Sequence, residues 1–141
     1  MTVINLYRMR RMIRETQKLA WKIERERSYA ARSAAPLSQI PWGQGNRSRG
    51  EEGAIRIADL KDVYREVLAE LEEMRQALDP LIDTLKNADD RAVMRLRYIK
   101  GYDPEDVAEA IFRTDRMVYY ILSRSEKELI KRFPDNFSVF Q

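Results

Sequence analysis

The chain contains no cysteine and no histidine among its 141 residues. These absences exclude thiol nucleophiles, imidazole bases and ordinary zinc sites. No G-x-x-x-x-G-K-[ST] phosphate loop is present, and Gly43-Gln44-Gly45 indicates a turn, because it neither follows a strand pattern nor opens a helix pattern. The glutamates Glu70, Glu72 and Glu73 lie on a long helical pattern and are expected to be solvated. We therefore expect no enzyme activity, no metal and no cofactor.

Glycine and proline are scarce, at five residues each, whereas 35% of the residues are charged. This composition favours long helices with coiled-coil character. No apolar run of about 18 residues is present, so no membrane span or membrane partner is expected. Arginines interrupt the N-terminal stretch where a signal peptide would need apolar residues. A cytoplasmic location is therefore expected, and the absence of cysteine agrees with it.

The net charge of +3 conceals an uneven distribution. Residues 1–49 carry a net charge of +8, residues 50–90 carry −7, and residues 91–141 carry +2. Segments of opposite sign attract each other, so the basic N-terminal segment is expected to pack against the acidic central one.

Residues 1–32 are expected to form a basic amphipathic helix. Its apolar positions follow the 3, 4 spacing of a heptad seam, at Leu6, Met9, Ile13, Thr16, Ala20 and Ile23. Basic side chains lie on the opposite face. That face is either solvated or contacts phosphate groups; the candidates for phosphate contact are Arg11, Arg14 and Lys18.

Residues 33–53 are rich in Gly, Pro and Ser, which predicts a loop. Residues 54–87 are expected to form a long helix, because apolar residues keep the heptad spacing over four heptads, at Ile57, Leu60, Tyr64, Val67, Leu71, Met74, Leu78, Leu81 and Leu85. Pro80 predicts either a kink or a new helix capped by Asp79. The two long helices pair either within one chain, as an antiparallel hairpin, or between two subunits, as a homodimer.

The heptad spacing of apolar residues does not continue in residues 88–133, whose pattern indicates three short helices. Asp89 or Asp90 is expected to cap the first helix, and Gly101 to end it. Asp103-Pro104 predicts the start of the second helix, and Thr114 predicts the start of the third, which stops before Phe133-Pro134. Residues 134–141 are expected to be a loose tail. The predicted fold class is all-α, a long helical hairpin or coiled coil followed by a trihelical module.

The second and third helices carry the pattern of a helix-turn-helix. Val107 and Ile111 supply one inner face, Val118 and Ile121 supply the other, and Ala108 is the small residue at the crossing. The N-terminal turns of the third helix would then enter the major groove of DNA. The exposed face of that helix is expected to comprise Thr114, Asp115, Arg116, Tyr119, Tyr120 and Ser123, flanked by Arg113 and Arg124.

The stretch VMRLRYIKGYDPEDVAEAIFRTDRMVYYI, residues 93–121, resembles the sigma-70 region-4-like helix-turn-helix of regulators from phages and prophages of Gram-positive bacteria. The upstream S-x-x-P-W-G and I-x-x-L-K motifs, at residues 38–43 and 57–61, extend the resemblance to residues 30–130. Similar proteins include the ArpU and RinA type of late transcription regulators. The resemblance implies a DNA-binding regulator in the cytoplasm of a bacterial host cell, with residues 114–120 in the DNA-reading helix.

Two features depart from a strong DNA-binding module. Phe112 occupies the turn position that usually carries glycine at positive φ, so either the turn has a different shape or Phe112 is buried within it. Residues 112–125 carry a net charge of only +2. Because phosphate contacts supply most of the affinity for DNA, one copy should bind weakly. Dimerisation, RNA polymerase or the basic N-terminal helix would supply the remainder.

Two alternatives to a transcription regulator stay open. A small terminase-type subunit for DNA packaging would also join a helix-turn-helix to an oligomeric coiled coil, and its ring assembly would distinguish it by mass. A protein-interaction module would use the coiled coil as its binding surface and would show no salt-dependent binding to DNA.

Overall fold

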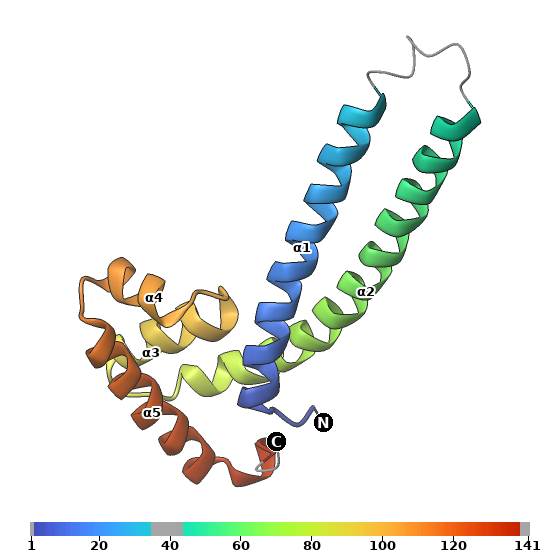
Figure 1. Ribbon diagram of the computed structural model, residues 1–141. Coiled ribbons are helices and arrows are strands. Elements are labelled where there is room, and N and C mark those ends of the chain that lie inside the picture. Colours follow the sequence, from blue (N-terminus) through green and yellow to red (C-terminus); the bar gives the residue numbers. More distant parts are fainter. Residues whose placement is uncertain (1, 35–43, 139–141) are drawn as a thin grey trace. The chain divides into compact units, whose positions relative to one another are not determined.

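The structure is a computed structural model that describes residues 2–34 and 44–138, and these residues form an all-helical fold (Figure 1). The elements in chain order are α1 (Leu6–Ala34), α2 (Gln44–Ile82), α3 (Ala88–Met94), a π-helical continuation (Arg95–Ile99), α4 (Pro104–Ile111), α5 (Asp115–Arg132) and a short 3-10 turn (Pro134–Asn136). The prediction of an all-α fold is therefore confirmed.

The helices are distributed over two compact units. One unit comprises residues 14–69 and holds most of α1 and the first part of α2; we call it the two-helix unit. The other unit joins the beginning of the chain, up to Ile13, to everything from Glu70 onward; we call it the C-terminal unit. The start of α1 therefore belongs to the same unit as α3, α4 and α5, which come much later in the sequence.

In the two-helix unit, α1 and α2 run antiparallel (Figure 1). Leu19 and Ile23 of α1 are buried, and the heptad residues of α2 between Ile57 and Val67 are half-buried. Arg56 Nε lies 3.5 Å from Glu26 Oε2, an ion pair between the two helices. The predicted seam of α1 is wrong at Ala20, which is exposed. The neighbouring Leu19, whose apolar side chain is larger, is buried in the seam instead.

The predicted boundaries of the second long helix are wrong at both ends. Residues 44–53 form the first turns of α2, whereas residues 35–43 of the predicted loop lie outside the described residues. Glycine lowers helix propensity without forbidding a helix, and no proline lies between Gln44 and Asp79. Pro80 is inside α2, so the alternative of a new helix capped by Asp79 is wrong. The helix ends at Ile82, earlier than the predicted residue 87.

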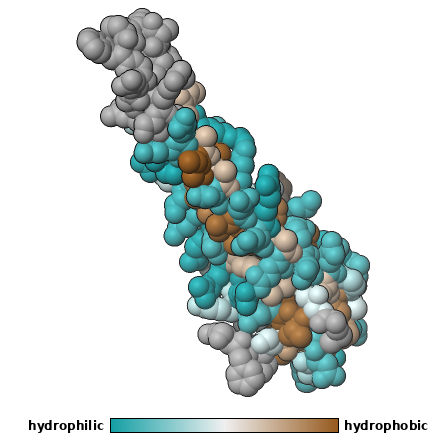
Figure 2. All heavy atoms as spheres, turned by 90° about the vertical axis from the view of Figure 1, so that its right-hand side faces the viewer, coloured by the Kyte–Doolittle hydropathy of each residue, from teal (hydrophilic) through white to brown (hydrophobic). Residues whose placement is uncertain are grey.

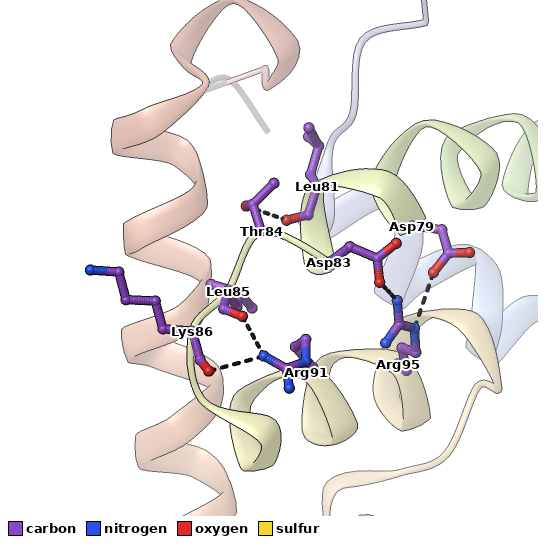
Figure 3. A network of polar contacts seen from close by, with 8 residues as sticks. All are labelled: Asp79, Leu81, Asp83, Thr84, Leu85, Lys86, Arg91 and Arg95. Carbon is purple, nitrogen blue, oxygen red and sulfur yellow. Dashed lines mark hydrogen bonds and ion pairs between the residues drawn. The ribbon is translucent and has the colours of Figure 1, made fainter.

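Figure 3 shows how the connection after α2 is held to α3. Arg91 Nη1 donates hydrogen bonds to the carbonyl oxygens of Leu85 (2.6 Å) and Lys86 (3.0 Å). Arg95 pairs with Asp83 and, at 3.2 Å, with Asp79. The Arg91 bonds satisfy carbonyl groups of the connection between α2 and α3, and Arg95 joins α3's continuation to the end of α2. They fix the point at which α3 begins.

The C-terminal unit packs α3 and α4 against α5. Its core contains fully buried side chains from each of these helices, with α4 also contributing Ala108 at 2% exposure; the others are Val93, Met94, Val107, Val118 and Leu129. Asp89 and Asp90 lie in the first turn of α3, and the predicted cap is wrong because Asn87 occupies that position. The predictions that Gly101 ends the π-helical continuation and that Thr114 caps α5 are confirmed.

Residues 134–138, the described part of the predicted tail, are not loose, and residues 139–141 lie outside the described residues. Ile4 N donates to Asn136 O and Ser138 N donates to Ile4 O, each at 2.8 Å, which makes a parallel bridge between Ile4 and Phe137. Ile4 is fully buried and Phe137 is 5% exposed. The apolar side chain of Phe137 therefore anchors residues near the end of the chain to residues near its beginning.

A buried polar contact ties α1 to the same unit. Tyr98, fully buried, donates its hydroxyl proton to Glu126 Oε1 and accepts a hydrogen bond of 2.8 Å from Arg10 Nη1. Burial, followed by the charge of Glu126, raises the pKa of Tyr98 well above its usual value. The phenol therefore stays protonated and donates to the carboxylate.

Candidate nucleic-acid interface

The corner between α4 and α5 is built by local backbone chemistry. Phe112 N donates to Glu109 O and Arg113 N donates to Ala108 O, the pair of bonds that closes a Schellman motif at the end of α4. Two residues later, Thr114 Oγ1 accepts a hydrogen bond of 3.2 Å from Met117 N and caps α5. Three residues therefore suffice to reverse the chain and start the next helix.

Phe112 itself adopts the left-handed conformation, with φ of 57° and ψ of 46°, and is the one non-glycine residue of the described chain with positive φ. Its side chain is 90% exposed. Both alternatives that we drew from the sequence are therefore wrong: the backbone takes the conformation usually given to glycine, and the ring is not buried. The Schellman hydrogen bonds hold the strained residue in place.

Helix α5 divides into a buried face and an exposed face. Val118, Ile121 and Leu122 are buried against the neighbouring helices. The structure brings the predicted DNA-reading residues together on the exposed side, namely Thr114, Asp115, Arg116, Tyr119, Tyr120 and Ser123. Tyr119 and Tyr120 are 51% and 59% exposed, so large aromatic rings dominate this face.

The two flanking arginines pair with carboxylates in the first turn of α3. Arg124 Nη2 donates to Asp90 Oδ1 at 2.5 Å, and the side chain of Asp90 is only 4% exposed. Arg113 Nη2 lies 3.4 Å from Asp89 Oδ2 in a more exposed pair. The hydrogen bond to Asp90 also raises the pKa of Arg124. Arg116 has no carboxylate partner among the described residues, so it is the cation of this face that is free for a ligand.

The tyrosines of the face are positioned by contacts of their own. Tyr119 Oη donates to Glu105 Oε1 of α4 at 2.9 Å, and this bond raises the pKa of Tyr119. The pKa of Glu105 is lowered by the backbone N–H at the start of α4 and then by Tyr119. Arg124 lies over the ring of Tyr120, with 5.2 Å from its guanidinium carbon to the ring centroid. These contacts hold both rings in fixed positions.

Sequence reasoning missed three residues at this corner. Met117 is 46% exposed although it lies next to the buried Val118, and Phe112 is exposed in the turn. Asp90 was considered only as a cap, whereas it is buried beside Arg124. The helical spacing of Asp90 with the apolar Val93 and Met94 was the signal that could have placed it on the inner face. A groove runs beside α5 between Met117, Tyr120 and Arg124 on one side and Asn87–Asp89 on the other.

The predicted phosphate contacts of the N-terminal helix lie in different units. Arg11 belongs to the C-terminal unit and stands beside Tyr7, with 5.9 Å from its guanidinium carbon to the ring centroid. Arg14 and Lys18 belong to the two-helix unit. All three side chains are exposed. The structure therefore leaves their role in phosphate binding as a prediction.

The chain matches the model of one protein family over residues 51–130, more than half of its length. The chain belongs to this family. The family is described as a protein of unknown function, DUF1492. The matched residues include most of α2 and all of α3 and α4, and they extend to Ile130 of α5, so the family model covers the candidate interface.

No curated protein and no solved structure matches the chain. In the described parts of the chain, no helix is long and apolar enough to cross a membrane. Nor do these parts contain a group of three or more acidic side chains placed to hold a metal ion.

Proposed function

We propose that α4 and α5 form a helix-turn-helix that reads double-stranded promoter DNA, and that the protein is a transcription regulator of the phage and prophage type. The observation that carries this proposal is the division of α5. Its N-terminal turns expose polar and aromatic side chains, while Val118 and Ile121 are buried. A recognition helix needs this division, because one face must be held by the fold while the other enters the major groove.

The chemistry of the exposed face suits direct reading of bases. Arg116 lies in the first turn of α5, where side chains reach base edges, and an unpaired guanidinium can bind guanine O6 and N7. In this proposal, the exposed side chains of Thr114 and Tyr120 contact a phosphate or a thymine methyl group. Arg113 and Arg124 contribute less to phosphate affinity than the sequence suggested, since Asp89 and Asp90 partly neutralise them.

The proposal is tested by selecting duplexes from a random library and titrating the selected site by fluorescence anisotropy at several salt concentrations. We expect salt-dependent binding. We expect Arg116→Ala to weaken binding by about 1–3 kcal/mol and to relax specificity at one base pair. Lys100→Ala removes the same charge from an exposed position outside α5 and is the matched control. Unchanged affinity and sequence preference in Arg116→Ala would show that α5 does not read DNA.

The predicted phosphate contacts give a different signature in the same titrations. Replacing Arg11, Arg14 and Lys18 together should weaken binding to all duplexes alike and flatten the salt dependence. RNA polymerase, the other expected partner, would raise the affinity for promoter DNA without changing which base Arg116 reads.

A specific observation favours protein binding as a second candidate function. Phe112 and Met117 expose apolar side chains beside α5, and no duplex contact requires a phenyl ring in the turn. Exposed apolar residues that cluster on a surface commonly mark a protein contact. If no duplex shows salt-dependent binding, this corner is an interaction site for another protein.

A further inference from the structure

The two-helix unit carries a second pattern on the outer faces of its helices, away from the seam between them. On α1, exposed side chains recur at spacings of three and four residues, and we call them the basic stripe: Arg14, Lys18, Trp21, Arg25, Tyr29 and Arg32. The four cations of this stripe have no carboxylate within ion-pair distance among the described residues. Trp21 is 61% exposed and Tyr29 55% exposed.

The outer face of α2 carries the opposite charge. The exposed residues recur at spacings of three, four, three and four, and we call them the acidic stripe: Glu52, Ile55, Asp59, Asp62 and Glu66. Ile55 is 61% exposed, and the neighbouring Val63 is 43% exposed. The outer side of α2 in Figure 1 faces the viewer in Figure 2, where apolar atoms interrupt a hydrophilic surface.

The residues of one stripe can be aligned with those of the other over their whole length. Trp21 and Tyr29 are eight residues apart, and so are Ile55 and Val63. An antiparallel alignment that sets Trp21 opposite Val63 pairs three cations of the basic stripe with carboxylates of the acidic stripe: Lys18 with Glu66, Arg25 with Asp59 and Arg32 with Glu52. It also sets Lys22, beside the basic stripe, opposite Asp62. Opposite charges and apolar residues thus coincide position by position.

A parallel alignment fits less well. It pairs the residues of the two stripes equally, with Lys18 opposite Glu52 and Arg32 opposite Glu66. It differs at Lys22, which it places opposite Arg56 instead of Asp62. Two cations brought together in this way repel each other. The antiparallel direction is therefore favoured.

We propose that the basic stripe of one chain docks, antiparallel, on the acidic stripe of a second copy of this chain. The contact joins two different surfaces, so it is head-to-tail: the assembly still offers a free basic stripe at one end and a free acidic stripe at the other. Apolar residues flanked by opposite charges are typical of surfaces through which helices pair. This inference does not depend on DNA reading by α5, and it gives Lys18 a contact that does not involve phosphate.

Charge reversal tests the contact in the full-length chain. Lys18→Glu with Arg25→Glu should abolish self-association measured by sedimentation, with at least a tenfold increase in the dissociation constant. Asp59→Lys with Glu66→Lys should do the same. Mixing the two variants, or combining all four changes in one chain, should restore assembly because each contact again joins opposite charges. Arg27→Glu with Lys100→Glu changes the net charge equally outside the stripes and is the matched control.

Disulfide trapping tests whether the two helices pair in antiparallel or parallel orientation. The chain has no cysteine of its own, so a disulfide can form only between the introduced cysteines. A mixture of Lys22→Cys chains with Asp62→Cys chains should give a covalent dimer under oxidation, whereas Lys22→Cys with Arg56→Cys should not. Circular dichroism of each variant checks that the helices remain.

Several outcomes would overturn the proposal. They are a monomer at all concentrations, association that the reversals do not change, or a mass that stops at two chains. Binding of single-stranded nucleic acid or of anionic vesicles that is lost in Lys18→Glu with Arg25→Glu, without any self-association, would assign the basic stripe to a different partner.

Discussion

Replacement of Phe112 by glycine should stabilise the protein, although it removes an aromatic ring. A non-glycine residue in the left-handed conformation costs about 1–2 kcal/mol. Glycine avoids this cost but loses about 0.5–1 kcal/mol through the greater freedom of the unfolded chain. The ring is 90% exposed, so little packing is lost. The net gain should be about 0.5–1 kcal/mol, which raises the melting temperature by roughly 2–4 °C.

The measurement is urea and thermal unfolding followed by circular dichroism at 222 nm. Phe112→Ala is the control, because it removes the ring and keeps a Cβ at positive φ. It should change the free energy of unfolding by less than about 0.5 kcal/mol, as surface substitutions usually do. If Phe112→Gly unfolds like Phe112→Ala, or earlier, the backbone at this turn is not strained and the reasoning is refuted. If Phe112→Gly is more stable but binds DNA or a protein partner less well, the exposed ring contributes to binding, and the strained backbone is tolerated because it presents that ring.

Three further predictions concern the C-terminal unit. Ala108→Leu should destabilise by about 1–3 kcal/mol because Ala108 is buried where α4 meets α5, while Ala108→Ser should be tolerated; equal melting temperatures would place the helix crossing elsewhere. Tyr98→Phe should cost about 1.5–3 kcal/mol at pH 7, since the lost hydrogen bond involves a carboxylate. The pKa of Tyr98 is raised in the folded protein, so its contribution is complete below about pH 10 and is lost as the pH rises further, and the variant should show a smaller loss above pH 10. Arg124→Ala should lower the free energy of unfolding by about 1–3 kcal/mol, because it leaves the carboxylate of Asp90 buried without its cation; a variant as stable as the parent chain would show that Asp90 does not need Arg124.

Local patterns predicted the corner between α4 and α5 well. Asp103-Pro104 and Thr114 set the helix starts, and the apolar residues at 107, 118 and 121 set the inner faces, because helix caps and helical periodicity act over a few residues. The exposed positions of α5 followed from the same periodicity. The ion pair between Asp90 and Arg124 did not, since it joins residues of different helices whose packing no local pattern specifies.

The errors along the long helices have physical reasons of the same kind. Glycines suggested a loop up to Gly53, but the surrounding helix continued through three of them. Ala20 fitted the heptad spacing, yet the neighbouring Leu19 is buried, because an apolar stripe is wide enough to accept either position. Pro134, which stops α5, suggested a loose tail, whereas Phe137 three residues later is buried beside Ile4.

The bridge between Ile4 and Phe137 has a consequence for how the chain folds during synthesis. The contact joins residues more than 130 positions apart, so it can form only after Phe137 has left the ribosome. The two-helix unit, which is complete by Ala69, can fold much earlier. Long-range closure of this kind slows folding, because the entropy of a large loop is lost before its contacts form. A fragment that begins at α3 would lack the partner of Phe137 and should expose that side chain to aggregation.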